Sequence, residues 1–377
     1  APEEEPAAQV RGSEAGMSRR EVLATTGAVL AGGSALLSLP ASAAPTPAPR
    51  ARPGEAAVRP PAHPGRDYDP VVVPNGAKLP WRIVEGVKVF HLIPEPVDHE
   101  FAPGLKVRCW GYNGTVHGPL LEAVEGERVR IYVTNRLPAP TTVHWHGMLV
   151  PSGMDGVGGI SQRAIHPGET FKYEFTLKGH GTFMYHSHHD EMVQMALGMA
   201  GLFVVHPRVR TRRVDRDFAI LLHEWRIDPD TMRPDPFEMI EFNVLTMNAK
   251  AFPATEPLVV RTGQRVRIRL GNLSATDHHP IHLHGFHFRV TETDAGPIPE
   301  SAQWPETTVL VPVGSSRTIE FVADAPGDWA LHCHMLHHMM NQMGHDAAKM
   351  IGVRTEGLDE RIRALLPGYM SMGQTGM

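Results

Sequence analysis

The chain has 377 residues, a length that accommodates two or three domains. Hydrophobic residues make up 42% and charged residues 20%, and the formal net charge is -5, so the composition gives no indication of nucleic-acid binding. The unusual values are 23 histidines and 18 methionines against 2 cysteines. Histidine and methionine side chains both bind copper, so their excess favours a metal-binding protein, whereas two cysteines exclude a disulfide framework.

The N-terminal part of the sequence has the features of an export signal. Ser18-Arg19-Arg20-Glu21-Val22-Leu23 is a twin-arginine pattern, a mostly apolar run continues to Leu39, and Ala41-Ser42-Ala43 is a small-residue cleavage site. A single membrane anchor is the alternative, but the run is short and rich in Gly, Ala, Ser and Thr. We therefore expect residues 1–44 to be an upstream segment and signal peptide, with a periplasmic or extracellular mature protein that is not membrane-bound. Residues 45–66, rich in Pro, Ala and Arg, indicate a linker.

After the linker, the pattern is one of short β-rich runs broken by Gly and Pro. Residues 129–133 and 171–177 alternate apolar and polar side chains with period two, as half-buried strands do. Long helical periodicity is scarce. The sequence predicts an all-β protein with two tandem β-sandwich domains, 67–210 and 211–355, followed by a C-terminal tail at 356–377.

The two predicted domains resemble each other, which indicates an internal duplication. The matching segments are Gly126–Ile131 with Gly263–Ile268, His144-Trp145-His146-Gly147 with His282-Leu283-His284-Gly285, and His186-Ser187-His188 with His332-Cys333-His334. In a strand, side chains at i and i+2 share a face, so each His-X-His pair can present two imidazoles to one cavity. A lone strand histidine is more often a half-exposed or core residue, but four pairs at repeated positions favour metal binding.

A second kind of metal site is indicated around the cysteine of the second domain. Cys333, His338 and Met343 follow one another at intervals of five residues. A thiolate, an imidazole and a weak axial thioether, completed by a second imidazole, form a blue-copper electron-transfer site. If residues 329–334 form a strand, the flanking histidines point away from Cys333. Cys333 would then connect two metal centres, although a buried core cysteine is the alternative.

The first domain has lost this second kind of site. Its counterparts to Cys333, His338 and His279 are Ser187, Met192 and a position near Thr141. Serine is a poor copper ligand beside thiolate, so we expect the blue-copper site in the second domain alone. The other cysteine, Cys109, is expected to be a buried core thiol.

These motifs together resemble those of the multicopper oxidase family, in particular its bacterial two-domain, laccase-like members, over roughly residues 70–354. The resemblance implies cupredoxin-like Greek-key domains and one type 1, one type 2 and a pair of type 3 copper ions for each chain. It assigns His279, Cys333, His338 and Met343 to type 1 copper, His144 and His282 to type 2, and His146, His186, His188, His284, His332 and His334 to the type 3 pair.

The resemblance also implies a proton-delivering acid, a quaternary structure and an activity. The acid is Asp155 in Met154-Asp155-Gly156, for which an ordinary turn residue is the alternative. A second family acid is missing, because residues 339–342 contain none. Two-domain members are homotrimers in which each trinuclear cluster lies between domain 1 of one chain and domain 2 of the next. The implied reaction is one-electron oxidation of phenols or aromatic amines, coupled to reduction of O2 to water.

Three other functions are compared with this one. A cuprous oxidase that serves copper tolerance is suggested by the methionines beside the copper motifs, Met192, Met195, Met199, Met335, Met339, Met340, Met343 and Met350, although soft core packing explains most of them. A copper-storage protein would not need a shared eight-histidine cavity. A copper nitrite reductase would need its blue site in domain 1, where Ser187 stands.

An axial Met343 implies a moderate reduction potential of the type 1 copper, which favours easily oxidised electron donors.

Overall fold

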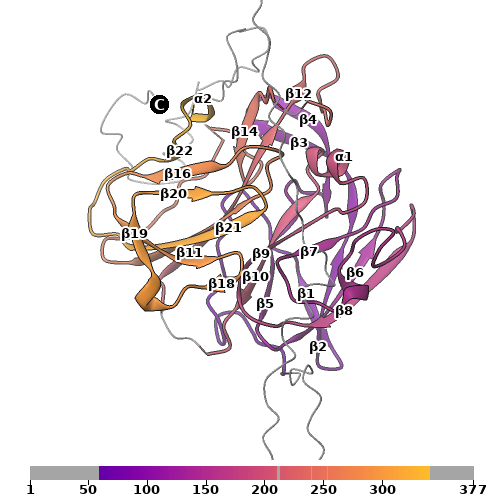
Figure 1. The fold of residues 1–377 in the computed structure, drawn as a ribbon, viewed down its shortest axis with the longest axis horizontal. Helices are drawn as coiled ribbons and strands as arrows, with labels where there is room; N and C mark the ends of the chain where they lie inside the picture. Colours follow the sequence, from indigo (N-terminus) through magenta and orange to yellow (C-terminus); the bar gives the residue numbers. More distant parts are fainter. Residues whose placement is uncertain (1–58, 210–212, 239, 253, 340–377) are drawn as a thin grey trace, which may run out of the picture. The chain divides into compact units, whose positions relative to one another are not determined.

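The computed structural model describes residues 59–209, 213–238, 240–252 and 254–339. The expected signal peptide (1–44), the expected axial ligand Met343 and the expected tail (356–377) lie outside these residues. Strands predominate and helices are short (Figure 1), which confirms the all-β class. None of the helices in the described ranges has both the length and the apolar character needed to cross a membrane.

The first half of the described chain forms two four-stranded sheets and a hairpin. One sheet has the order β1-β2-β6-β8, the other β5-β10-β9-β7, and β3 pairs with β4. The elements are β1 (Trp81–Val84), β2 (Val87–Leu92), β3 (Pro94–Ala102), β4 (Leu105–Tyr112), β5 (Leu121–Val124), β6 (Arg128–Thr134), β7 (His144–His146), η1 (Ser152–Met154), β8 (Thr170–Thr176), β9 (Gly181–His186), α1 (Glu191–Ala196) and β10 (Ala200–His206).

The second half repeats this plan with a larger sheet. The order is β14-β11-β15-β21-β17-β18, with β19 on β17, and a second sheet has the order β20-β16-β22. The elements are β11 (Arg216–Trp225), β12 (Ile227–Asp228), β13 (Arg233–Pro234), β14 (Val244–Met247), β15 (Arg265–Asn272), β16 (His279–Leu283), β17 (Phe288–Thr293), β18 (Gly296–Pro297), η2 (Glu300–Ala302), β19 (Trp304–Glu306), β20 (Thr308–Val311), β21 (Ser315–Val322), β22 (Leu331–Cys333) and α2 (Leu336–Met339).

Alternating side chains explain how the strands pack into sandwiches. In β6, Val129, Ile131 and Val133 are buried while the residues between them are partly exposed. They join a core cluster that includes Trp145 of β7 and Phe203 of β10, so this cluster lies between the two sheets of the first half. Burying apolar surface at about 25 cal/mol per Å² is the main stabilising contribution of such a core. A separate cluster fills the second half in the same way.

Strand register confirms the internal duplication. His144 of β7 pairs with His186 of β9, and His282 of β16 pairs with His332 of β22. In the first half, β6 pairs in parallel with β2 and antiparallel with β8. In the second half, β15 pairs in parallel with β11 and antiparallel with β21. Ile165 pairs with Thr141 and Val311 pairs with His279. Three residues after each of them, Gly168 and Gly314 have positive φ angles of 81° and 70°. The same turn therefore precedes the same strand twice.

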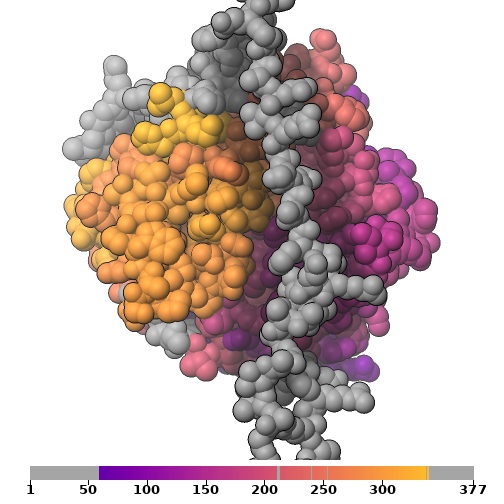
Figure 2. All heavy atoms as spheres, viewed as in Figure 1, coloured from indigo at the N-terminus to yellow at the C-terminus, as the bar shows by residue number. Residues whose placement is uncertain are grey.

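The two halves also share contacts, so their cores are not independent. The β3–β4 hairpin packs with Trp225, Ile227 and Val244 from the second half in one apolar cluster. In Figure 2 the orange residues of the second half form one continuous area of the visible surface. The proposed domain boundaries, 67–210 and 211–355, remain a prediction.

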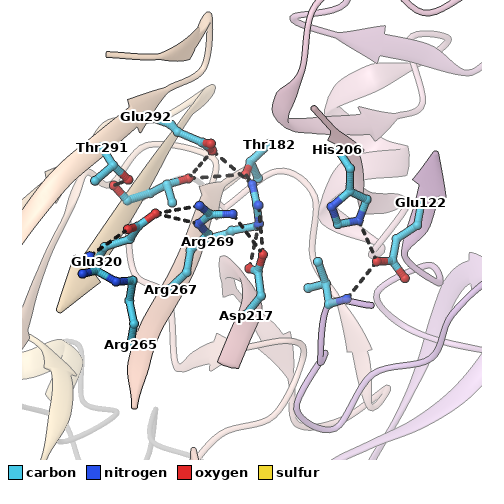
Figure 3. A network of polar contacts seen from close by, with 12 residues as sticks. Glu122, Thr182, His206, Asp217, Arg265, Arg267, Arg269, Thr291, Glu292 and Glu320 are labelled. Atoms are coloured by element: carbon cyan, nitrogen blue, oxygen red, sulfur yellow. Dashed lines mark hydrogen bonds and ion pairs between the residues drawn. The ribbon is translucent and has the colours of Figure 1, made fainter. Parts of the chain in front are cut away.

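A buried arginine provides a polar connection between the halves (Figure 3). Arg269 of β15 has 1% exposure, and its guanidinium donates hydrogen bonds to Asp217 at 2.8 and 3.0 Å and to Glu292 at 3.0 Å. It also donates to the Thr182 hydroxyl of β9 at 2.9 Å, so one side chain joins both halves.

Candidate metal centres

Three histidines of the first half converge on one point. Their ring nitrogens lie within 4.8 Å of one another: His144 and His146 on β7, and His186 at the end of β9. His188 follows the strand, and its ring centroid is 5.4 Å from that of His144. All four line a cavity of about 660 Å³. We call them the first half-site; the predicted i, i+2 pairing thus places all four imidazoles together.

Hydrogen bonds fix the tautomers of two of these rings. His144 Nδ1 donates to the carbonyl of Asp155 at 2.7 Å, and His186 Nδ1 donates to the carbonyl of Ser187 at 2.9 Å. Because a carbonyl oxygen can only accept, the hydrogen is on Nδ1 and each ring, when neutral, has its lone pair on Nε2. His186 Nε2 lies 3.3 Å from His146 Nδ1. Burial lowers the pKa of His186 to about 3, and burial also lowers the pKa of His146. These shifts favour the neutral rings of His146 and His186 that metal binding requires.

The second half builds an equivalent group, the second half-site. It consists of His282 on β16, His284 just after it, His332 on β22 and His334. His284 Nε2 and His332 Nε2 are 3.0 Å apart, and His332 Nδ1 donates to the Cys333 carbonyl at 2.9 Å. His282 Nδ1 donates to the carbonyl of Thr307 at 2.8 Å. His186 and His332 thus use the same anchor, the carbonyl of the next residue, and His284 and His332 turn their Nε2 atoms toward each other.

Within one chain the two half-sites stay apart. His282 and His284 line a different cavity from the first half-site, and among the described residues no ring contact joins a histidine of one group to a histidine of the other. From the second half, Gly314 lines the cavity of the first half-site, and a Cβ there would lie 3.7 Å from the His146 ring. Each chain therefore carries both groups without bringing all eight imidazoles together.

A buried trio of different chemistry lies in the core of the second half. Cys333 Sγ is 3.7 Å from His279 Nδ1 and 3.6 Å from His338 Nδ1. The expected strand is shorter than predicted, because β22 covers 331–333 and not 329–334. Alternation still holds: Cys333 pairs with Ile281 in the core, while His332 pairs with His282. The trio and the second half-site are thus connected by two adjacent residues, Cys333 and His332.

The distal nitrogens of the trio have polar partners. Ser274 Oγ is 2.7 Å from His279 Nε2, and Asp277 Oδ2 is 3.1 Å from His338 Nε2. Burial, with His338 nearby, lowers the pKa of His279 to about 3. Burial raises the pKa of the Cys333 thiol to about 11, and a coordinated cation would favour its thiolate. Two imidazoles and a sulfur in one cluster form a donor set that fits copper.

The first half carries a hydrogen-bonded polar cluster where the second half has the trio. Thr141 bridges to Ile165 as His279 bridges to Val311, so these positions correspond. Gln194 Oε1 accepts from the Thr141 hydroxyl at 2.7 Å and from the Ser187 hydroxyl at 2.6 Å. Buried Gln194 thus occupies the place that His338 has in the trio. Met192, the counterpart of His338 expected from the sequence, is 49% exposed.

Comparison with known proteins agrees with this geometry. Models of the multicopper oxidase family match residues 95–210 and 228–351, together more than half of the chain. The chain belongs to the multicopper oxidase family. This is a family of oxidoreductases, and the membership confirms the predicted resemblance. Its solved members support the cupredoxin-like fold class.

Three relatives illustrate the extent of the similarity. The solved blue copper oxidase from Nitrosomonas europaea is 31% identical, with a TM-score of 0.61, and the match covers 66% of this chain and 79% of that one. Copper resistance protein A of Pseudomonas syringae pv. tomato is 39% identical over 123 residues, 32% of this chain and 20% of that protein. Multicopper oxidase MmcO of Mycobacterium tuberculosis is 29% identical over 240 residues, 55% of this chain and 47% of its own length. The chain spans about a fifth of the length of the copper resistance proteins that it matches.

Asp155, the predicted proton-delivering acid, lies beside His144. Its Oδ1 is 3.5 Å from His144 Nδ1, and its side chain is 35% exposed. The following Gly156 has a φ of 87°, and a Cβ there would lie 1.8 Å from the Val143 carbonyl. Only glycine permits this close approach, which holds the turn against the strand that carries His144.

Other side chains near the centres were not found from the sequence. Ser274 and Asp277 contact the trio, and Glu191 lies 3.5 Å from His186 Nδ1 and 3.7 Å from His188 Nε2. Their only sequence signal is proximity in the chain to a motif histidine, which many residues share.

The remaining sulfur-containing residues take different environments. Met199 is fully buried, Met335 packs against the core of the second half, and Met192 is exposed. Cys109 is buried in β4 with 2% exposure and is not in a disulfide, which confirms the prediction of a core thiol. Met340, Met343 and Met350 lie outside the described residues.

Proposed function

We propose that this chain is a two-domain, laccase-like multicopper oxidase that oxidises phenolic or aromatic amine donors by one electron and reduces O2 to water. The observation that carries the proposal is the arrangement along β22. Cys333 lies in the buried trio, and its neighbour His332 belongs to the second half-site. A donor site and an oxygen site are thus one covalent step apart, which suits electron transfer between them.

The residues fit a specific set of copper positions. The trio of His279, Cys333 and His338, with Met343, would hold type 1 copper, and the two half-sites would hold the type 2 and type 3 ions. The assignment is His144 and His282 for type 2, and His146, His186, His188, His284, His332 and His334 for the type 3 pair. Bound copper supplies one-electron redox chemistry and coordination positions for O2.

The protein's own groups orient these ligands and handle protons. Carbonyls of Asp155, Ser187, Thr307 and Cys333 hold Nδ1 hydrogens, which leaves the opposite nitrogens free. Reduction of O2 to water consumes protons, and the half-exposed carboxylate of Asp155 beside His144 is placed to take them from solvent. We propose this role for Asp155.

The proposed assembly is a homotrimer. Each chain carries two separate half-sites, and a cyclic arrangement joins the first half-site of one chain to the second half-site of the next. The separation of the two groups within a single chain supports this arrangement.

A second candidate function is oxidation of Cu(I), with the cuprous ion as substrate. Met192, Met195 and Glu191 line the same cavity as the first half-site, and thioethers are suitable ligands for Cu(I). Relatives named copper resistance protein A are 38–39% identical over about a third of the chain. These observations favour a role in copper tolerance.

Oxygen uptake by copper-loaded protein tests both candidates. A methoxyphenol and Cu(I) are compared at equal enzyme concentration, together with copper content and visible absorption. We expect faster turnover with the phenol and a blue absorption band, both lost in Cys333→Ser and kept in the matched Cys109→Ala. Faster turnover with Cu(I) would favour the second candidate. No uptake with either donor despite full copper loading would contradict both.

We also propose export by the twin-arginine route to the periplasm or the extracellular space. The twin arginines Arg19 and Arg20 carry this proposal. Substitution of both by lysine should keep the folded protein in the cytoplasm, as measured by fractionation of expressing cells; unchanged export would contradict the route.

A further inference from the structure

One buried carboxylate outside the predicted ligand set lies between the two kinds of metal centre. Glu224, near the end of β11, has 2% exposure. It lines the cavity of the first half-site, and it also contacts the loop that precedes β16 and the trio. Neither the sequence motifs nor the family assignment gives it a role.

The contacts of Glu224 are made to the backbone of that loop. Its Oε1 accepts the N–H of Thr276 at 2.7 Å and the N–H of Asp277 at 3.2 Å, and the Thr276 hydroxyl is 3.3 Å away. A buried carboxyl oxygen can accept these backbone N–H groups whether the acid is ionised or neutral, and leaving such N–H groups without an acceptor is unfavourable. Glu224 therefore holds the chain at residues 276 and 277.

The same loop supplies both partners of the trio's imidazoles. Ser274 contacts His279 Nε2 at 2.7 Å, and Asp277 contacts His338 Nε2 at 3.1 Å. Partners of this kind fix the orientation of ligand rings, and their loss typically lowers metal affinity about 10- to 100-fold. Movement of the loop would release both rings together.

We infer that Glu224 is a positioning residue for the trio: it holds the 274–277 loop, which orients the imidazoles of His279 and His338. This inference rests on the proposed function, because the trio matters as a type 1 copper site. Glu224 acts on the trio through Ser274 and Asp277.

The test compares Glu224→Ala, which removes the acceptor, with Glu224→Gln, which keeps an amide oxygen for the Thr276 and Asp277 N–H groups. We expect Glu224→Ala to weaken type 1 copper binding about tenfold, at the low end for such partners, and to shift the blue band. Glu224→Gln should restore most of both. The measurements are chelator competition and absorption spectroscopy of the full chain, which do not depend on turnover.

Two controls separate positioning from general destabilisation. Glu292→Ala removes another buried carboxylate of the second half, from the Arg269 cluster, and should leave the blue band unchanged. Ser274→Ala removes the His279 partner directly. The combined Glu224→Ala and Ser274→Ala effect on copper affinity should be smaller than the sum of the two, since both act through one loop.

The outcomes decide between three cases. Glu224→Ala protein with wild-type copper affinity and an unshifted band would overturn the inference alone, as would full additivity with Ser274→Ala. Copper-loaded wild-type protein without blue absorption would overturn the proposed function and this inference with it.

Discussion

Histidine side chains in this chain are distinguished by what their ring nitrogens contact. In the half-sites, one nitrogen of His144, His186 or His332 is fixed by a carbonyl, and the other faces further imidazoles. His117 and His223, by contrast, are buried beside Trp225 and their nitrogens have no hydrogen-bond partner of ordinary geometry. Residue type alone therefore does not identify a candidate ligand, whereas an anchored ring with a converging nitrogen has the geometry that a ligand needs.

His99 provides a test of how burial controls protonation away from the metal centres. Its Nε2 donates to the Ala249 carbonyl, and burial lowers its pKa to about 4. The neutral form is favoured in the folded state, so its stability contribution is complete above pH 6.5 and is lost as pH falls from 6.5 towards 4. We expect His99→Gln to make copper-free protein less acid-sensitive in this window, by about 3 kcal/mol at its lower end, in urea unfolding at several pH values. An unchanged pH slope would contradict the assignment.

Ser187 tests whether a cysteine alone can restore a second blue site. The Ser187 hydroxyl and that of Thr141 both donate to Gln194, so the pocket lacks both imidazoles of the trio. We expect Ser187→Cys to bind no additional copper and to lower the free energy of unfolding by about 1–3 kcal/mol, because a hydrogen bond to buried Gln194 is lost. Copper analysis and visible absorption measure the first effect, and urea unfolding the second. A second blue band would show that a thiolate is sufficient.

At the scale of strands, sequence periodicity predicted much of the site because the relevant geometry is local. An i, i+2 histidine pair in an extended segment must share a face, whatever surrounds it. The pairing of β7 with β9 and of β16 with β22 then brought matching pairs together. The positioning contacts could not be predicted in this way. Glu224 and Thr276 are 52 positions apart, and only tertiary packing brings them together.

Arg269 of β15 tests the connection between strands of the two halves. It is paired with Asp217 and Glu292 and donates to Thr182 on β9. Arg269→Met should lower the free energy of unfolding by about 3–5 kcal/mol, because two buried carboxylates lose their main partner. Arg265→Gln is the matched control on the same strand: its side chain is 35% exposed and 4.0 Å from Glu320, so we expect a change of about 0–1 kcal/mol.

Chemical unfolding of both arginine variants provides the measurement. Equal losses of unfolding free energy in Arg269→Met and Arg265→Gln would contradict the stabilising role of the buried Arg269 ion pairs.

At the scale of the whole molecule, the sequence contained all eight histidines but not the way in which they meet. The spacing rules that pair two imidazoles act within a strand, whereas the approach of two half-sites depends on surfaces that no motif describes. The structure adds that one chain keeps the groups in separate cavities. Our proposal that an assembly completes the oxygen site therefore requires a test on mixed chains.

Mixing two inactive variants tests this assembly directly. The first variant carries His144→Ala and His146→Ala, the second His282→Ala and His284→Ala, so each lacks one half-site. In a cyclic trimer every mixed ring contains one intact junction, and random equal mixing should restore about a quarter of wild-type oxygen uptake. Each variant alone should be inactive, and co-expression with two different affinity tags isolates the mixed trimers. If the eight histidines instead met within a single chain, no mixture would recover activity, because every chain would carry a damaged cluster.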